Sequence, residues 1–253
     1  REAFNVSCNP AFIQISEKIG ANTSYKYYDA YGFFEKTGIN TIGESNSIFW
    51  DLKNVGPVEL ATMSFGQRFK ITPLQMITAV CAVANDGVLM KPRLVKEVKN
   101  SDTGAITTID ATAVRQVISK TTASTMMNML ETVVTDGSGK YAKIKGYSIA
   151  GKTGTSEPDY GTNEGYTASF IAISPTENPE IVLLVTLYDP QGPKGYSGNT
   201  VAAPVAAQML KEILPYMQIS ADNSGNSNST KTISIPNVVN KTVAEAEKIL
   251  KNT

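Results

Sequence analysis

Three strand-like runs follow one another closely between residues 147 and 190. They read YSIAGKTGTSE, TASFIAISP and EIVLLVTLYDP, and turn-forming residues separate them. The third run is apolar at nearly every position, which predicts a strand that is buried on both faces. A helix is predicted next, from about residue 199 to 216, with an apolar side formed by Val201, Val205, Met209, Leu210 and Ile213. This order predicts an antiparallel sheet packed against helices, an α/β or α+β layer fold.

The N-terminal half is predicted to be mainly helical. Asn9 and Pro10 are typical of a helix start, with Asn9 as the cap, and an apolar face continues as far as Gly20. Further helices are predicted over residues 23–34, 72–87 and 120–134, the last of which ends at TDGSGK. Residues 38–66 are predicted to be irregular, and short strands are expected on either side of a turn at residues 100–104.

The chain is predicted to have three parts. Residues 1–218 form the main domain, and residues 219–231, which include the small polar run SADNSGNSNSTK, form a flexible linker. Residues 232–253 begin a new unit, with a short strand, a proline and an amphipathic helix. This last unit is too short to bury a core by itself.

Missing residue types exclude several kinds of chemistry. The chain has no histidine, which excludes Ser-His and Cys-His nucleophile pairs and the H-E-x-x-H metal site. Cys8 and Cys81 are the two cysteines, and their spacing does not support a disulfide framework. No cofactor is expected, although a metal or thiol role for Cys8 stays open. Lys plus Arg and Asp plus Glu both number 23, and this balance does not favour a nucleic-acid partner.

The segment Gly151–Thr155 is predicted to be an edge strand that faces a pocket. Gly154 allows a substrate to lie close to the backbone, and Lys152 supplies a positive charge. The hydroxyls of Thr153 and Thr155 lie on one face because strand side chains alternate, and the unpaired N–H of Thr155 could stabilise an oxyanion. The alternatives are a plain edge strand and a phosphate loop, although a phosphate loop requires a different order of Gly and Lys.

Several stretches resemble the transpeptidase domain of class B penicillin-binding proteins, whose motifs are S-x-x-K, S-x-N and K-[ST]-G. Lys152-Thr153-Gly154 matches the third motif, and Ser7-Cys8-Asn9 matches the second. Residues 64–92 and 132–157 also resemble the family, and the likeness covers about residues 1–216. The tail IPNVVNKTVAEAEKIL resembles the start of a PASTA repeat, as in the sporulation and division types of the family.

The resemblance implies a role for each matched residue. In the family, a serine attacks D-alanyl-D-alanine, releases the last D-alanine and passes the acyl group to an amine. Ser7 then relays a proton to the leaving nitrogen, Asn9 binds the substrate amide, and Lys152 tunes the charge near Ser7. Thr153 and Thr155 hold the substrate carboxylate, and the Thr155 N–H is half of the oxyanion hole. The alternatives are helix capping for Ser7 and Asn9, a solvated Lys152 and an exposed, non-catalytic Glu157.

The first motif is missing from the sequence, because no serine has a lysine three positions later. The nucleophile is therefore expected upstream of residue 1, which would leave this fold incomplete on its N-terminal side and the chain alone inactive. A membrane anchor, also upstream, would hold the enzyme at the extracytoplasmic face of the bacterial membrane.

The resemblance also implies partners, namely peptidoglycan stem peptides, β-lactam antibiotics and a membrane glycosyltransferase. Two further readings stay open: a β-lactam sensor or hydrolase, and a non-catalytic wall-binding or scaffold protein. The acceptor amine and the choice between division, elongation and sporulation also stay open.

Overall fold

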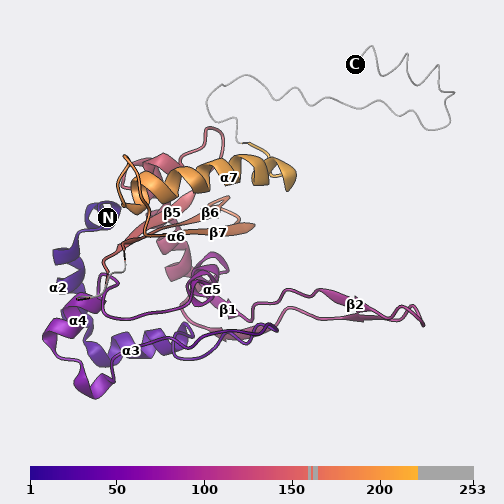
Figure 1. The fold of residues 1–253 in the computed structure, drawn as a ribbon, viewed down its shortest axis with the longest axis horizontal. Coiled ribbons are helices and arrows are strands. Elements are labelled where there is room, and N and C mark those ends of the chain that lie inside the picture. Colours follow the sequence, from indigo (N-terminus) through magenta and orange to yellow (C-terminus); the bar gives the residue numbers. More distant parts are fainter. Residues whose placement is uncertain (159–160, 162–164, 222–253) are drawn as a thin grey trace, which may run out of the picture. The chain divides into compact units, whose positions relative to one another are not determined.

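A three-stranded antiparallel sheet forms the centre of the molecule in the computed structural model, which describes residues 1–158, 161 and 165–221 (Figure 1). Its strands are β5 (Ala150–Ser156), β6 (Thr167–Ser174) and β7 (Ile181–Tyr188), in the spatial order β5-β6-β7. Lys152 pairs with Ile171, which in turn pairs with Leu184. β5 is therefore an edge strand of this sheet, as predicted.

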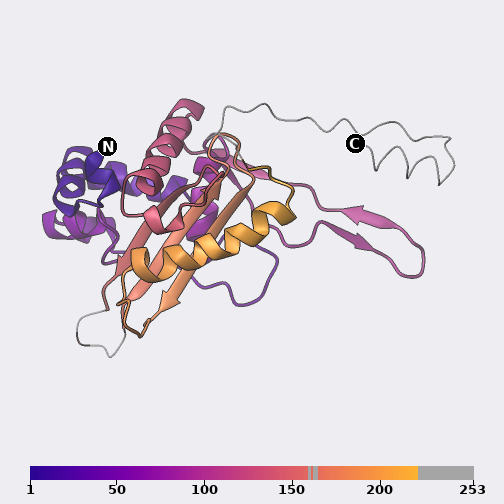
Figure 2. The same ribbon diagram turned by 90° about the horizontal axis from the view of Figure 1, so that it is seen from above.

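Helices cover both faces of the sheet (Figures 1 and 2). On one face lies α7 (Ala203–Tyr216), whose Leu210 packs with Phe170 of β6 in a buried cluster. On the other face lie α5 (Pro73–Ala84) and α6 (Lys120–Thr135), and here Leu130 packs with Ile173. Phe170 and Ile173 are an odd number of positions apart on one strand, so they point to opposite faces. The predicted antiparallel sheet packed against helices is thus confirmed.

The predicted double-sided burial of the third strand is confirmed only in part, because side chains of β7 pack against the core on both faces but most of them are half-buried. Within β7 only Val185 is buried, whereas β6, which lies between two strands, is buried from Phe170 to Ser174. The continuous apolar run belongs to an edge strand of the described sheet, and β6 is buried although its sequence includes serine and threonine. Position in the sheet therefore determines burial here more than the apolar content of the run.

The predicted apolar side of the last helix is also partly wrong. Val205 and Met209 of α7 are 39% and 41% exposed. The buried side carries Ala203, Ala206, Ala207, Leu210 and Leu214. Alanines allow the helix to approach the sheet closely. The prediction relied on the larger apolar side chains, and it therefore assigned part of the exposed side of α7 to the buried side. A five-residue π-helix, η3 (Gly198–Ala202), precedes α7.

The N-terminal helices differ from the prediction in their ends. α1 (Glu2–Asn5) precedes the predicted helix start, and α2 spans Asn9–Ile19. The cap of α2 is Cys8, with no side-chain hydrogen bond, and Asn9 is the first helical residue. Capping by Asn9 is therefore wrong. α3 spans Ala21–Ala30, and it both begins and ends earlier than expected. Gly20, at φ +78°, lies between α2 and α3 and separates the two helices.

The segment predicted to be irregular contains two helices. These are the 3₁₀ turn η1 (Leu52–Asn54) and α4 (Pro57–Met63). α4 begins with a proline in its first turn, and the Glu59 carboxylate accepts a hydrogen bond from the Gly56 N–H at 3.0 Å. Such local start signals were present in the sequence, but the helix is only two turns long and has a weak apolar period.

The remaining helix starts follow the prediction. The Thr72 hydroxyl accepts a hydrogen bond from the Gln75 N–H at 3.1 Å, and Ser119 caps α6 through the Thr122 N–H in the same way. Two small antiparallel ladders lie between α5 and α6. They are formed by β1 (Val88–Met90) with β4 (Ala113–Gln116), and by β2 (Glu97–Lys99) with β3 (Ile106–Thr108). The β2–β3 hairpin extends far from the rest of the molecule (Figure 1).

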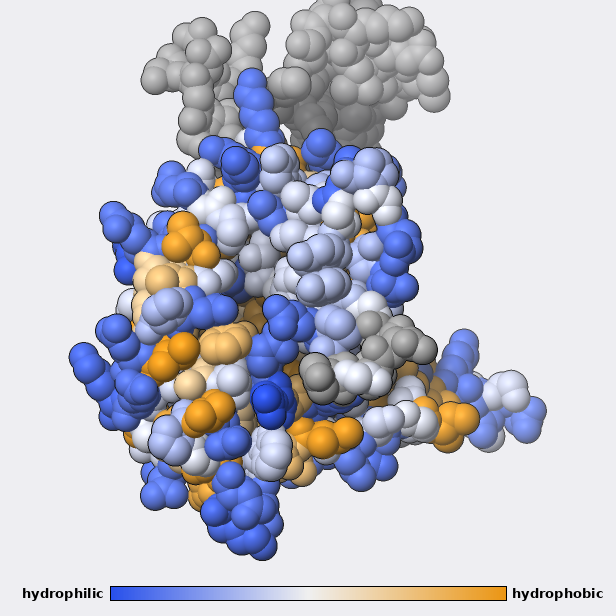
Figure 3. All heavy atoms as spheres, turned by 60° about the vertical axis from the view of Figure 1, so that its left-hand side comes forward, coloured by the Kyte–Doolittle hydropathy of each residue, from blue (hydrophilic) through white to orange (hydrophobic). Residues whose placement is uncertain are grey.

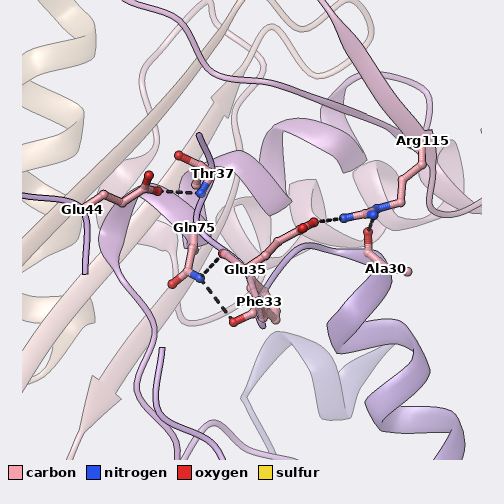
Figure 4. Close-up of polar contacts among 7 residues, drawn as sticks. All are labelled: Ala30, Phe33, Glu35, Thr37, Glu44, Gln75 and Arg115. Carbon is pink, nitrogen blue, oxygen red and sulfur yellow. Dashed lines mark hydrogen bonds and ion pairs between the residues drawn. The ribbon is translucent and has the colours of Figure 1, made fainter. Parts of the chain in front are cut away.

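Polar contacts hold the irregular segment after α3 against its neighbours (Figure 4). Arg115 of β4 forms an ion pair with Glu35 and donates to the Ala30 carbonyl at 2.9 Å. Gln75 of α5, which is 2% exposed, donates to the carbonyls of Phe33 and Glu35. Satisfying these backbone carbonyls fixes the path of the segment without a regular element.

The tyrosines of α3 belong mainly to an aromatic cluster. Tyr25 is buried and packs against Phe34, and its hydroxyl donates to the Trp50 carbonyl at 2.6 Å. Tyr28 contacts Phe49, while Tyr27 is 47% exposed. Tyr25 and Tyr28 therefore have a packing role.

The described part belongs to one compact unit that ends at Ala221. Ile219, the first residue of the predicted linker, is buried in the core. The rest of the predicted linker and the PASTA-like unit, residues 222–253, lie outside the described residues. Within the part of the chain that the structure describes, no helix is long and apolar enough to cross a membrane.

Cys81 is half-buried, and this burial raises the pKa of its thiol.

Candidate active site

A cavity of about 830 Å³ lies where the turn before α2, the turn after α4 and the edge strand β5 meet. Its lining includes all the residues predicted from the two motifs, namely Ser7, Asn9, Lys152, Thr153, Gly154 and Thr155. The fold thus brings together residues that are more than 140 positions apart in the sequence. Figure 3 shows the side of the molecule on which α2 and α4 lie, where polar and apolar side chains are interspersed.

Lys152 joins the two motifs directly. Its Nζ donates hydrogen bonds to the Ser7 hydroxyl and, at 3.1 Å, to the Thr153 carbonyl. The side chain is partly buried, and burial lowers the pKa of the Lys152 ammonium because desolvation disfavours the charged form. The arrangement places a lysine of lowered proton affinity next to a hydroxyl, which is the pairing needed to pass a proton between them.

Ser7 adopts an uncommon backbone conformation. Its φ angle is +53°, a region that residues other than glycine seldom occupy. The Cys8 N–H donates to the Ala3 carbonyl at 2.8 Å, so the turn between α1 and α2 is fixed by backbone bonds. Asn9 opens α2 without capping it, which leaves its side chain available at the cleft. Backbone strain in a turn that lines a cavity is typical of functional sites.

The backbone of β5 presents donors at its edge. The Thr153 carbonyl accepts from Lys152, so it points away from β6. In an antiparallel strand, the N–H and C=O groups of alternate residues point the same way, and the Thr155 N–H therefore lies at the same edge as the Thr153 carbonyl. An N–H directed into a cleft can stabilise a developing oxyanion.

The two threonine hydroxyls already have partners within the protein. The Thr153 hydroxyl lies 3.1 Å from that of Ser138, and the Thr155 oxygen accepts a hydrogen bond from the Gly198 N–H at 3.1 Å. Since Thr155 uses a lone pair in this bond, its hydrogen remains available for a ligand that accepts. Such a ligand could be a carboxylate.

Gly154 has a packing reason to be glycine. A Cβ at this position would lie 2.5 Å from the Ser169 Oγ of β6, and a Cβ on Gly198 would lie 2.3 Å from the Gly154 carbonyl. Contacts within the protein therefore already require glycine at this position.

Ser138 is a site residue that the sequence reasoning missed. It lines the cleft, and its N–H donates to the Asn5 carbonyl at 2.9 Å while its hydroxyl contacts Thr153. A Cβ on the preceding Gly137 would lie 2.7 Å from the same Asn5 carbonyl. The loop thus connects the segment that carries Ser7 to the strand that carries Lys152. In the sequence, Ser138 lies in the run Gly-Ser-Gly, which by itself indicates only the end of a helix.

Aromatic and acidic groups also line the cleft. The rings of Tyr166 and Tyr196 stack at 3.8 Å with an interplanar angle of 16°. Glu157 lines the same cavity and is exposed, as expected. Asn199 of η3 also lines it, and its Oδ1 is buried without a hydrogen-bond partner among the described atoms. No group of three His, Cys, Asp or Glu residues that could hold a metal occurs within the described ranges, and Cys8 has no such neighbours.

Comparison with known proteins identifies similar sequences and structures. The family model "Penicillin binding protein transpeptidase domain" matches residues 1–211. Stage V sporulation protein D of Bacillus subtilis is 36% identical over 99% of this chain, which corresponds to 40% of that protein. Peptidoglycan D,D-transpeptidase FtsI of Escherichia coli K12 is 30% identical over 77% of this chain and 32% of FtsI. The chain thus spans less than half the length of these relatives.

Among solved structures, penicillin binding protein 3 of Mycobacterium tuberculosis in complex with ampicillin is similar, with a TM-score of 0.78 and 28% identity. The similarity covers 88% of this chain and 52% of that one. A putative peptidoglycan glycosyltransferase of Atopobium parvulum gives a TM-score of 0.74 at 31% identity, over 85% of this chain and 50% of that one.

Proposed function

Because this chain belongs to the penicillin-binding protein transpeptidase domain family, we propose that it is part of a peptidoglycan D,D-transpeptidase that cross-links stem peptides. The observation that carries the proposal is the contact between Lys152 Nζ and Ser7 Oγ at the edge of β5. No serine in the 253 residues has a lysine three positions later. We therefore propose that the nucleophilic serine and its lysine lie in a part of the protein that precedes Arg1.

In the proposed acylation step, the serine gives its proton to the lysine of the first motif, and its oxygen attacks the carbonyl carbon of the penultimate D-alanine and forms a C–O bond. The Thr155 N–H stabilises the negative charge on the carbonyl oxygen. The C–N bond then breaks, and the nitrogen of the departing D-alanine takes a proton from Ser7. Lys152 supplies that proton in turn, which its lowered pKa favours near neutral pH.

The terminal carboxylate of the donor peptide is proposed to bind at Thr153 and Thr155. The Thr155 hydroxyl accepts from Gly198 and donates its own hydrogen to the carboxylate, and the ammonium of Lys152 adds electrostatic attraction. Asn9 is proposed to bind the amide of the donor. In the second step, an amine of another stem peptide attacks the acyl-ester, an amide bond forms and the C–O bond to the serine breaks. The serine oxygen takes the proton that the amine loses, and the proton held by the lysine of the first motif returns to Lys152.

The wider setting is also proposed from the family. β-Lactams would act as donor mimics, and the ampicillin complex of the similar Mycobacterium protein supports this expectation. An anchor upstream of this chain would hold the site at the extracytoplasmic face of the membrane, beside a glycosyltransferase partner. Residues 219–231 would link the domain to a PASTA-like module at residues 232–253.

The proposal is tested by intact-protein mass spectrometry after incubation with benzylpenicillin, on this chain and on the full-length protein that contains it. The expected result is one penicilloyl adduct on the full-length protein and none on this chain. An adduct on this chain alone would contradict the proposed position of the nucleophile. The absence of S-x-x-K in this sequence supports one rival, a non-catalytic scaffold of the same fold. Unmodified full-length protein would favour that rival.

A further inference from the structure

The β2–β3 hairpin presents unpaired strand edges away from the rest of the molecule (Figure 1). Within the described ranges, β2 pairs with β3 and with no other strand. Residues 93–108 are all exposed, and they include Val98 and Ile106, whose exposed fractions are 55% and 58%. An unpaired edge with exposed apolar side chains is a surface on which another strand can add.

The hydrogen bonds of the hairpin show which residues of β2 face its free edge. The Lys96 carbonyl accepts a hydrogen bond from the Ile109 N–H at 2.9 Å, so the backbone groups of Lys96 point toward the β3 side. These directions alternate along an antiparallel strand. The N–H and C=O groups of Glu97 and Lys99 therefore point away from β3 and can bond to a strand of another molecule.

The side chains of the same two residues carry opposite charges. Within the described part of the chain, neither Glu97 nor Lys99 forms an ion pair. Charges on an edge strand often prevent pairing, because like charges would meet. On this edge the sign changes between residues 97 and 99, so a partner strand with the opposite order of charges is attracted.

A second copy of this chain supplies that order when its β2 pairs in the antiparallel direction. Glu97 of each copy can then lie opposite Lys99 of the other, with a two-fold axis between the two Val98 residues. The neighbouring registers with the same backbone bonding place Glu97 opposite Glu97, or Lys99 opposite Lys99. Like charges directly opposite each other destabilise a sheet, so the charges select the first register.

We propose that the free edge of β2 is a self-association surface, at which two copies of the protein form a four-stranded antiparallel sheet in the order β3-β2-β2-β3. The free edge of β3 is less suitable, because its outward residues Ile106 and Thr108 carry no charge that would select a register. The projection of the hairpin allows two copies to meet at this edge. The pairing joins only a few residues of each copy, so the association is weak and reversible.

Disulfide formation by Val98→Cys in the full-length protein tests the pairing. In the proposed register the two Val98 residues form a non-hydrogen-bonded pair, with Cα atoms about 4.5 Å apart, which a disulfide can bridge. Thr107→Cys is the matched control, because Thr107 lies opposite Val98 on β3. The two copies of Thr107 would be three strand spacings, or roughly 14 Å, apart. Under mild oxidation, we expect disulfide-linked dimers from Val98→Cys, and from Thr107→Cys no more than from the unsubstituted protein.

Charge reversal tests the register. Glu97→Lys or Lys99→Glu, each combined with Val98→Cys, should lower the dimer yield about tenfold, because two attractive pairs become repulsive. An equal mixture of the two variants should restore the yield, since each lysine then meets a glutamate. Melting temperatures check that every variant is folded.

Three outcomes would overturn the proposal. One is an equal dimer yield from Val98→Cys and Thr107→Cys, which would show only chance collision of exposed cysteines. Another is dimer formation by Thr107→Cys alone, which would assign the contact to the edge of β3. The third is a Val98→Cys dimer that neither charge reversal weakens, because the Glu97–Lys99 pairs would then play no part in it.

Discussion

The hydroxyl of Ser138 lies 3.1 Å from the hydroxyl of Thr153, and this contact joins a loop after α6 to the strand that carries Lys152. The same Ser138 donates its N–H to Asn5, two residues before Ser7. Both halves of the site are therefore attached to one short loop. Because both attachments bear on the distance between Ser7 and Lys152, we expect Ser138 to be a positioning residue for the proposed proton transfer between them.

Replacing Ser138 with alanine removes the hydroxyl contact and keeps the backbone bond to Asn5. We expect the rate of acylation of the full-length protein by benzylpenicillin to fall about three- to tenfold, the usual value of one hydrogen bond. Ser138→Thr, which restores a hydroxyl, should recover most of the rate. The melting temperature is the control measurement. If Ser138→Ala lowered stability and left acylation unchanged, the loop would have a structural role only.

The sequence predicted the parts of this site that are local. The motif residues Ser7, Asn9 and Lys152 could be selected because each lies in a short pattern, and the alternation along β5 follows from strand geometry. Ser138 could not be selected, because its role depends on contacts with Asn5 and Thr153 that are distant in sequence. A Gly-Ser-Gly run indicates a turn wherever it occurs and contains no information on what the turn contacts.

The same distinction applies to the fold. The starts of α5 and α6 were predictable because Thr72 and Ser119 cap their own helices. The degree of burial of β7 and the buried side of α7 were not predictable, since they depend on which strand lies at the edge and on how closely a helix approaches the sheet. Val205 is an example, because its apolar side chain suggested burial and its actual position is exposed.

The two sides of α7 should differ sharply in their contribution to stability. Leu210 is fully buried between the helix and the sheet, and Leu210→Ala is expected to lower the free energy of unfolding by about 2–5 kcal/mol. Val205→Ala, on the exposed side of the same helix, should change it by no more than about 0.5 kcal/mol. Denaturant titration of both variants measures these values. Equal losses would show that Val205 is buried, as the apolar pattern had suggested.

Lys152 is expected to reduce stability while it supports activity. Burial lowers its pKa, so the folded protein binds the lysine proton more weakly than the unfolded chain does. This penalty is fully present below the folded pKa, and it disappears as the pH rises from that value toward the ordinary pKa of lysine. Lys152→Met, which does not titrate, should therefore gain stability relative to the wild type at pH 7, and the gain should shrink as the pH approaches 10.5.

The acylation rate of Lys152→Met should fall by about 10²–10³, as for the loss of one main electrostatic contact to the reacting groups. Denaturant titrations between pH 7 and 10 and acylation by benzylpenicillin provide the two measurements. A stability difference that grows with pH would show that the lysine proton is bound more tightly in the folded protein.

Asn9 offers a direct test between helix capping and a role in binding. A capping asparagine loses about 1 kcal/mol of stability on replacement with alanine, but Asn9 is the first helical residue and makes no capping bond. We therefore expect Asn9→Ala to change the free energy of unfolding by less than about 0.5 kcal/mol. Its acylation rate should fall about three- to tenfold, because a hydrogen bond to the donor amide is lost.

Ser119→Ala is the matched control for this variant, because Ser119 caps α6 and lies outside the cleft. It should lose about 0.5–2 kcal/mol of stability and keep the wild-type acylation rate. Asn9→Ala is thus expected to lose activity and keep stability, whereas Ser119→Ala is expected to lose stability and keep activity. If Asn9→Ala instead behaved like Ser119→Ala, the side chain of Asn9 would be a helix cap, and its assignment to the substrate site would be wrong.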